Sequence, residues 1–277
     1  MIKTPDDQNY LVDLTDGVLR LSFNRPEFGN ALPSTAIPML EQLFRAAQDD
    51  PSIRCILIEG KGKVFSAGGD LVGFARSIEQ DVETRQADFA RRLAAVGELV
   101  QAVVAFDRPV VAAIRGATAG VGLLFPLAAD VAIGDDSAAF VFAHQRVGLS
   151  PDGGVTSLLP QVVGERTART LLLSAAKIDA VEAHRLGILS RVVAAEVLAQ
   201  ESDRLTQRLA QAPRGAIVAA KRLVRASKTT PLGEQLAAET AAMVDCVGNA
   251  DFIEGVRAFI EKRPARFPSA NTSRHRA

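Results

Sequence analysis

Apolar and polar residues in the first part of the chain switch repeatedly between the period of a strand and the spacing of an amphipathic helix. Short apolar runs at 11–14 and 18–24 flank Asp16-Gly17, a dipeptide typical of tight turns, and predict a β-hairpin. A stripe at helical spacing follows Ser34, which can cap a helix, and Asp49-Asp50-Pro51 ends it. The other segments that we predict as strands or a long helix are 53–58, 82–106, 110–114 and 131–134. Strands that alternate with helices predict an α/β core.

The pattern changes beyond about residue 195, where strand signals are absent. Four amphipathic segments follow, separated by Pro or Gly, and they predict helices at 197–210, 216–227, 232–247 and 252–260. We therefore predict two domains. An α/β core at 1–195 carries the functional site, and a helical module occupies 196–277.

Composition and charge exclude several classes of partner. The 277 residues are 48% hydrophobic, enough for a full core, and 32 basic residues balance 32 acidic ones, which disfavours nucleic-acid and membrane-surface binding. The longest apolar stretch, 121–129, is far shorter than the ~20 residues needed to cross a bilayer. Two cysteines and three histidines lack the spacing of a metal site. We therefore expect no bound metal. Because the first residues also lack a secretory signal, we expect a cytoplasmic protein.

Small residues concentrate in two segments, 64–71 and 115–122, each directly after an apolar strand. Glycine has no Cβ, so backbone N–H groups in such segments can approach an oxygen atom without steric obstruction. A helix that begins at Gly120 would direct its positive end the same way. The segments therefore favour an oxyanion hole, and the alternative is that the glycines only permit close packing of helix against sheet.

Motifs of other enzyme classes fit poorly. Gly120-Val121-Gly122 has Phe125 where a dinucleotide fingerprint needs its third glycine, and the glycines around Lys61 lack the spacing of a phosphate-binding loop. No Gly-x-Ser-x-Gly elbow of a serine hydrolase is present. A further candidate is Asp152, which lies in Pro-Asp-Gly-Gly, either as a turn or cap residue or as a catalytic acid.

Four segments together resemble the crotonase, or enoyl-CoA hydratase/isomerase, superfamily. They are the Arg-Pro to Asn-Ala-Leu element at 25–32, the two glycine-rich segments at 65–71 and 116–130, and a closing helix at 254–263. The resemblance implies a core of repeated strand-strand-helix turns in a spiral and a helical C-terminal module that mediates trimers. Homotrimers, or dimers of trimers, are the expected assembly.

The resemblance also implies where an acyl-CoA thioester binds. The backbone N–H groups of Ala67 and Val121 would hold the thioester oxygen as negative charge builds on it. The residues expected to contact coenzyme A are Arg25, Ala67, Gly68, Gly69, Asp70, Leu71, Gly120, Phe259 and Lys262, the last two often from a neighbouring subunit. Coenzyme A enters as part of the substrate, and no tightly bound cofactor is expected.

One departure from the family pattern bears on the reaction. Hydratases of this family use two glutamates, and the matching positions here are Leu124 and His144. Because leucine cannot transfer a proton, water addition by a paired acid and base is not supported. Asp152 matches the single acid of isomerases of the phenylacetate-pathway type, which favours double-bond or ring isomerisation with Asp152 as acid/base.

Other interpretations remain open at the level of sequence. His144 either assists proton transfer at the site or is an ordinary partly buried histidine. Asp152 could instead act as a nucleophile, as in the dehalogenases of the family, or His144 could support a residual hydratase activity. The chain could also be a catalytically silent trimer that binds acyl-CoA.

Overall fold

The computed structural model describes residues 8–270, and the side chains of Leu71 and Val72 lie outside that description. Its first element is the predicted hairpin. Strands β1 (Tyr10–Thr15) and β2 (Val18–Phe23) pair antiparallel, and Asp16 and Gly17 between them have φ of 50° and 80°. Two successive left-handed residues match the right-handed twist of the strands, so the turn prediction is confirmed.

The chain then builds a parallel sheet onto this hairpin. The order is β1-β2-β3-β4-β6-β9, and every pair after the first is parallel. The added strands are β3 (Cys55–Gly60), β4 (Val110–Ile114), β6 (Val131–Asp135) and β9 (Arg191–Val193). A second, three-stranded sheet contains β5 (Ala117–Ala119), β7 (Ala139–Val141) and β8 (Lys177–Asp179), in that order. The predicted α/β core is confirmed.

Helices cover both faces of the main sheet, which explains why its central strands are apolar throughout. On one face lie α1 (Ala36–Asp49) and α3 (Val82–Ala105), and Ile56 and Ile58 of β3 point into the large apolar cluster there. On the other face lies α8 (Leu198–Ala210), which packs with Leu57 in a second apolar cluster. Alternate residues of one strand thus enter two separate cores.

Three phenylalanines hold the two glycine-rich segments against the sheet. Phe65 precedes the first segment, Phe125 follows the second, and the ring of Phe23 on β2 lies 5.5 Å from one and 5.0 Å from the other. All three side chains are fully buried. Since a close-packed interior leaves little room for adjustment, this contact fixes the relative position of the two segments.

Several short elements between residues 71 and 190 complete the core. They are α2 (Leu71–Ala75), α4 (Leu124–Ala128), α5 (Val155–Val163), α6 (Glu165–Leu173) and α7 (Ala180–Arg185). The sequence pattern did not predict these helices or the three-residue strands of the second sheet, because segments this short carry too few residues to show a period.

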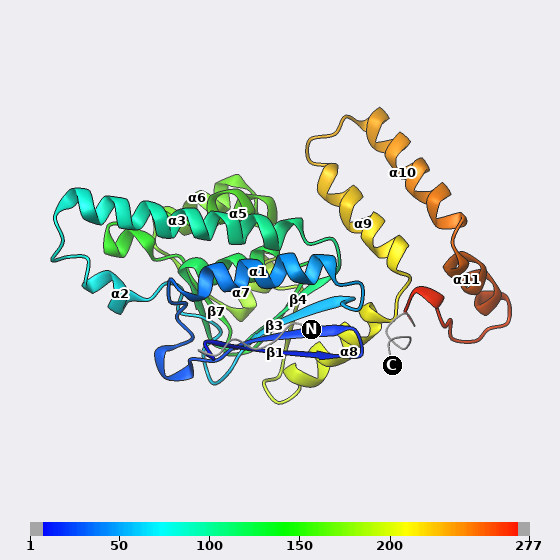
Figure 1. Cartoon of the computed structure of the whole chain (residues 1–277), viewed down its shortest axis with the longest axis horizontal. Helices are drawn as coiled ribbons and strands as arrows, with labels where there is room; N and C mark the ends of the chain where they lie inside the picture. Colours follow the sequence, from blue (N-terminus) through cyan, green and yellow to red (C-terminus); the bar gives the residue numbers. More distant parts are fainter. Residues whose placement is uncertain (1–7, 271–277) are drawn as a thin grey trace.

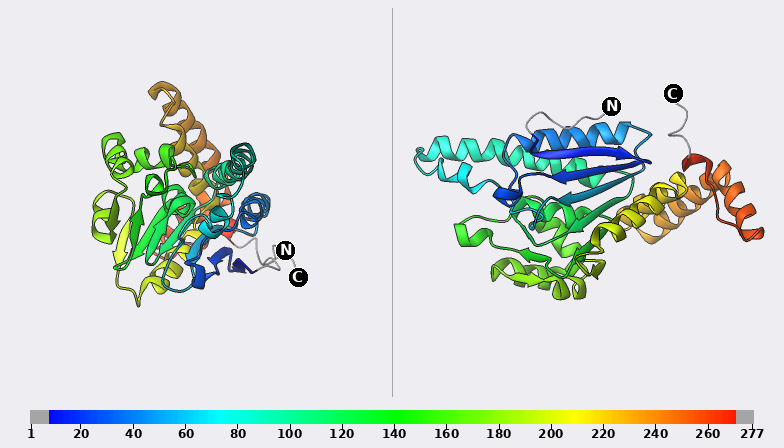
Figure 2. Two further views of the ribbon diagram at one scale, coloured as in Figure 1. Left: turned by 90° about the vertical axis from the view of Figure 1, so that its left-hand side faces the viewer. Right: turned by 90° about the horizontal axis from the view of Figure 1, so that it is seen from below.

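The last three helices, α9 (Arg214–Ala226), α10 (Leu232–Val247) and α11 (Ala250–Ile260), form what we call the C-terminal arm. The arm projects from one end of the core (Figures 1 and 2). All four predicted C-terminal helices are confirmed, although α8 packs on the sheet and not with the arm. The division into domains at 195/196 stays a prediction. No helix in residues 8–270 is long and apolar enough to span a bilayer.

Candidate functional site

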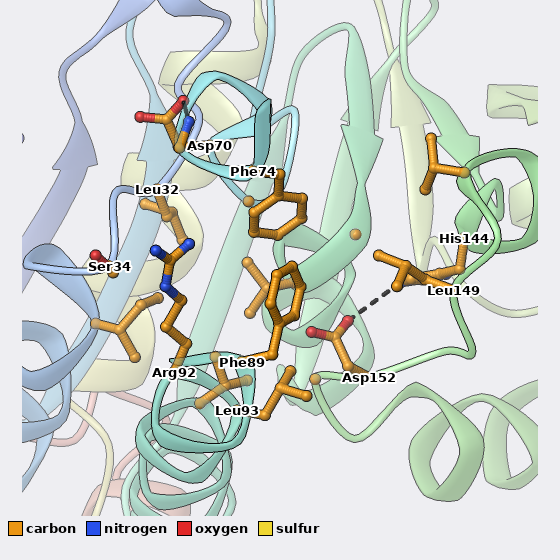
Figure 3. A pocket seen from close by; sticks show the side chains of 18 of the residues that line it. Leu32, Ser34, Asp70, Phe74, Phe89, Arg92, Leu93, His144, Leu149 and Asp152 are labelled. Carbon is orange, nitrogen blue, oxygen red and sulfur yellow. Dashed lines mark hydrogen bonds and ion pairs between the residues drawn. The ribbon is translucent and has the colours of Figure 1, made fainter. Parts of the chain in front are cut away.

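A cavity of about 1130 Å³ lies between the two glycine-rich segments, the α2–α3 region and the turn before α5 (Figure 3). It draws together residues from distant parts of the chain. Seven of the predicted site residues line it: Ala67, Gly69, Asp70, Gly120, Val121, His144 and Asp152. Much of the remaining lining is apolar, including Phe74, Phe89 and Leu93. A large apolar cavity with a few convergent polar groups is the usual form of a ligand site.

The first glycine-rich segment is held in place by Asn30, which is buried and has a positive φ of 55°. Its side chain accepts a hydrogen bond from the N–H of Arg25 at 2.8 Å and donates to the carbonyls of Lys61 at 2.9 Å and Val64 at 2.6 Å. Its carbonyl accepts from the Ser66 hydroxyl at 3.0 Å. Asn30 therefore positions the segment, a role that the sequence pattern did not reveal.

Three consecutive N–H groups of this segment differ in their partners. The N–H of Ala67 donates to the carbonyl of Gly29 at 2.8 Å, and that of Gly68 donates to the Ser66 hydroxyl at 3.2 Å. In the part of the chain that the structure describes, the N–H of Gly69 has no protein acceptor. The prediction that Ala67 is an oxyanion donor is therefore wrong, because its N–H is already bonded. Gly69, which was expected only to contact coenzyme A, has the available N–H.

The second segment supplies Val121 beside it. Val121 lies in the first turn of a 3-10 helix, Gly120–Leu123, where N–H groups have no acceptor within the helix. The predicted helical start at Gly120 is thus confirmed. Among residues 8–270 no other acceptor is seen for this N–H. Both Gly69 and Val121 line the cavity, so two N–H groups from different segments are free at its wall.

Glycine is required where the two segments touch. A Cβ on Gly68 would lie 2.7 Å from the Ala119 carbonyl oxygen and 3.0 Å from Gly120 Cα, and φ at Gly68 is +91°. Gly120 has a φ of +50°, and a Cβ there would lie 3.6 Å from the N atom of Gly69. The absence of a Cβ at both positions therefore permits the contact that brings the two N–H groups together.

One of the two acids that line the cavity is Asp152, and it is paired with His144. Asp152 Oδ1 lies 3.2 Å from His144 Nε2 (Figure 3). Asp152 does not cap α5 through its side chain, since the N-cap is Gly154 without a side-chain bond. A Cβ on Gly153 would lie 3.3 Å from Val121 Cα, so the turn that carries the acid packs directly on the second segment. The acid and the Val121 N–H share one end of the cavity.

The sequence profile described as enoyl-CoA hydratase/isomerase matches residues 13–270. The chain belongs to the enoyl-CoA hydratase/isomerase family. A relative from Rhodobacter capsulatus named "Probable enoyl-CoA hydratase" is 36% identical over 256 residues, which cover 92% of this chain and 96% of the relative. The 1,2-epoxyphenylacetyl-CoA isomerase of Escherichia coli is 34% identical over 258 residues, which cover 91% of this chain and 95% of that protein.

A solved enoyl-CoA hydratase from Bacillus anthracis shares the fold, with a TM-score of 0.87, 26% identity and coverage of 95% of this chain and 100% of the other. The crotonase-type fold is therefore confirmed, and the chain is an enzyme of the enoyl-CoA hydratase/isomerase family. Because these relatives are named both hydratase and isomerase, membership of the family leaves the reaction to be inferred from the residues of the site.

Carboxylates are few in this family member's cavity. Of the described residues that line it, only Asp70 and Asp152 carry one. Asp70 lies 3.9 Å from the guanidinium of Arg25. Leu124, at a position where hydratases have a glutamate, is 0% exposed and belongs to the main apolar cluster. The described residues also contain no group of three or more His, Cys, Asp or Glu side chains that could hold a metal.

Four predicted coenzyme contacts do not line the cavity. Arg25 donates to the carbonyl of Ala31 at 3.0 Å, and Gly68 lies behind the wall, where it contacts Gly120. Phe259, 85% exposed, and Lys262 lie at and just beyond the end of α11, at the opposite end of the chain's long axis from α2 (Figure 1). Within one chain the structure does not bring these two residues to the cavity. Leu71 begins α2, and its side chain is outside the description.

Proposed function

We propose that the protein is an enoyl-CoA isomerase in which Asp152 moves the proton and the N–H groups of Gly69 and Val121 hold the thioester oxygen. The observation that carries this proposal is a single carboxylate, Asp152, at the end of the cavity where the Val121 N–H is free. The substrate is an acyl-CoA thioester, and coenzyme A is part of that substrate and not a resident cofactor.

The chemistry needs only these groups. Asp152 removes a proton from a carbon of the acyl chain, and the electrons move onto the thioester oxygen to give an enolate. Two fixed N–H groups stabilise that oxygen, and loss of one such donor typically costs ~2.7–4 kcal/mol in the transition state. The protonated Asp152 then returns the proton to a different carbon. Atoms balance without water, so the product is an isomer of the substrate.

His144 positions the acid in this scheme. Its Nδ1 is buried and has no hydrogen-bond partner among the described residues. A ring proton on Nε2 points at Asp152, since Nε2 is the ring nitrogen that has a partner. That proton is donated to Oδ1 of Asp152. Oδ2 of Asp152 is left to face the substrate.

Hydration is the weaker alternative because it requires a second acid or base across from the first. Leucine at 124 has no transferable proton, and its burial in the apolar cluster removes it from the cavity. His144 is the remaining group that could activate water, and its ring is already engaged with Asp152. Isomerisation uses the groups that are present.

The direct test is to incubate the protein with a 3-enoyl-CoA, crotonyl-CoA, an epoxide-bearing aryl-CoA and a halobenzoyl-CoA, and to separate the products by liquid chromatography, which resolves isomers, before mass spectrometry. We expect double-bond migration or ring isomerisation without change in mass. Asp152→Asn should lower kcat about 10²- to 10⁴-fold, the usual contribution of a general acid/base. His144→Ala should lower it less, and His144→Gln, which can donate to Asp152, should recover part of the loss.

The rival functions give different results in the same experiment. A product heavier by one water would support a hydratase, and halide release would support Asp152 as a nucleophile. If the unmutated protein turns over none of these substrates while a saturated acyl-CoA still binds, the protein is a silent binder. If turnover is present and Asp152→Asn leaves it unchanged, Asp152 is not the acid/base, and either result contradicts the proposal.

We also propose that the protein assembles as a homotrimer or a dimer of trimers through the C-terminal arm. Large apolar side chains that are half or more exposed concentrate on α10 and α11: Leu232, Leu236, Met243, Val244, Ile253, Phe259 and Ile260. Apolar surface of this extent is typical of an interface between subunits. Sedimentation velocity should show a trimer or hexamer that Met243→Lys dissociates, and a monomer would contradict the proposal.

A further inference from the structure

Arg92 is a charged residue inside the cavity that the proposed chemistry does not use. It lies on α3 and lines the cavity together with Phe89 and Leu93 of the same helix. Figure 3 shows Arg92 and Asp152 on opposite sides of Phe74 and Phe89, whose ring centroids are 5.0 Å apart. The two charged side chains therefore stand at different ends of an apolar space.

Arg92 forms no close ion pair in residues 8–270, and the nearest acid on its own helix, Asp88, attracts it but is bonded elsewhere. Arg91 is exposed and forms an ion pair with Asp88, whose other carboxylate oxygen accepts from Gln80 at 2.9 Å. Arg92 lies over the Phe89 ring, with its guanidinium carbon 5.8 Å from the centroid. Within residues 8–270 we find no carboxylate in ion-pair contact with it. A guanidinium stays charged at any pH of interest, so a positive charge faces the cavity.

The other charges of the cavity do not neutralise it. Asp70 is 3.9 Å from Arg25, and Asp152 is bound to His144. Two further arginines, Arg76 and Arg146, are exposed residues of the cavity wall. The cavity of an electrically neutral protein thus carries a local excess of positive charge, which favours an anionic ligand.

The geometry of α3 places Arg92 at a distance from the reacting end. Val100 packs against the turn that carries the acid, since a Cβ on Gly154 would lie 2.9 Å from Val100 Cγ1. Arg92 is eight residues earlier on the same helix, which corresponds to about 12 Å along the axis. Between them, Leu93 and Val96 line the cavity. Apolar side chains therefore line the cavity between Asp152 and the Arg92 guanidinium.

We propose that Arg92 binds a carboxylate at the far end of the acyl chain, so that the substrates are CoA thioesters of enoic diacids. This inference rests on the proposed function, because Asp152 marks the reacting end. The planar guanidinium matches the two oxygens of a carboxylate, and its central carbon lies 5.8 Å from the centroid of the Phe89 ring. The intervening apolar residues suit the methylene groups of the chain better than the polar arm of coenzyme A.

The test measures binding of unreactive probes by calorimetry, which separates this inference from the question of turnover. The probes are adipoyl-CoA and suberoyl-CoA, each compared with the monoacid thioester of equal length, hexanoyl-CoA or octanoyl-CoA. Charge-assisted hydrogen bonds of this kind are typically worth a roughly 10- to 100-fold change in Kd. We expect the protein to prefer one of the diacid thioesters by that factor. Arg92→Leu should abolish the preference, and Arg92→Gln provides a second variant if it misfolds.

Arg91→Leu is the matched control, because it removes the same charge from the neighbouring position outside the cavity. It should leave the preference intact. The inference is overturned if the wild-type protein binds both members of each pair equally, or if Arg91→Leu acts as strongly as Arg92→Leu. A third result would also overturn it. Arg92→Leu could weaken the binding of the diacid and the monoacid thioester equally, and have no effect on the binding of probes that lack the ribose phosphate of coenzyme A. Arg92 would then bind that phosphate.

Discussion

The core and the C-terminal arm both contain amphipathic helices, but the apolar faces of the core helices are buried and those of the arm are exposed. Leu40 and Phe44 of α1 are almost fully buried against the sheet, whereas Met243 of α10 and Phe259 of α11 are 69% and 85% exposed. The arm attaches to the core through long polar side chains of α9, among them Lys221, which bonds to Asp130 at 2.6 Å. An apolar stripe in the sequence therefore shows that a face is to be covered, and leaves open what covers it.

The candidate site lies in the core alone. Every residue that lines the cavity lies between positions 32 and 154, inside the core. Buried side chains of the core, among them Asn30 and Phe23, hold its backbone groups in place. The arm carries none of the lining residues that the structure describes, so changes there should alter stability or assembly and leave the site geometry of a single chain unchanged.

The largest difference should appear when one phenylalanine is removed from each region. Phe44→Ala should lower the free energy of unfolding by about 3–5 kcal/mol, because the ring is buried against Phe106 at 6.1 Å and leaves a cavity. Phe259→Ala should change it by less than about 0.5 kcal/mol in dilute, dissociated protein. Urea unfolding of both variants tests this. A large loss for Phe259→Ala under those conditions would break the comparison.

A glycine of the core should be the next most sensitive position. Gly68→Ala places a Cβ 2.7 Å from the Ala119 carbonyl oxygen and pushes the two glycine-rich segments apart. We expect kcat/KM to fall roughly 100- to 1000-fold, as when one oxyanion donor is lost. Gly233→Ala on α10 is the control, because nothing lies within 4 Å of the added Cβ. Unchanged activity in Gly68→Ala would mean that this contact does not hold the N–H groups in place.

The junction between the regions should show a smaller effect. Lys221→Met removes its hydrogen bonds to Asp130 at 2.6 Å and to the Arg108 carbonyl at 2.9 Å. The local opening free energy of α9, measured by amide hydrogen exchange, should fall by about 1–3 kcal/mol. Arg222→Met, an exposed change on the same helix, should leave the exchange rates of α9 as they are. Equal rates in both variants would show that this bond does not fasten the arm.

The smallest expected effect is a change in how the Tm depends on acidic pH when Glu254 of α11 is replaced. Hydrogen bonds from the Arg263 guanidinium and the Arg266 N–H lower the pKa of Glu254 from 4.5 to about 2. Because the folded-state pKa is the lower one, the stabilisation is complete above about 4.5 and is lost as pH falls towards 2. Glu254→Gln should reduce the acid-dependent fall in Tm slightly, and exposed Glu239→Gln should not. Identical acid profiles for Glu254→Gln and the unchanged protein would contradict this.

Much of the fold followed from local patterns. The sequence predicted the hairpin at Asp16-Gly17 from its turn dipeptide. It also predicted the helix over 82–105 and all four C-terminal helices, because helical spacing of apolar residues continues over many residues in each. The strands β5, β7 and β8 were not, since three residues show no alternation. Their pairing depends on contacts between residues far apart in the chain.

The site shows the same limit at the scale of single atoms. Sequence reasoning found both glycine-rich segments, His144 and Asp152, and placed one oxyanion donor on Ala67. The register between the first segment and residues 29–32 engages the Ala67 N–H and leaves that of Gly69 free. Three adjacent small residues are equivalent in the sequence, and only the hydrogen-bond partner of each N–H distinguishes them.

The sequence by itself determined the α/β class, the family and the absence of a second acid at Leu124, because these depend on residue identity and order. The tertiary structure decided which N–H is free, that His144 bonds to Asp152, and that Arg92 faces the same cavity from two helical turns away. Each of these depends on a distance between residues that are not neighbours in the chain, and a one-dimensional pattern contains no such distance.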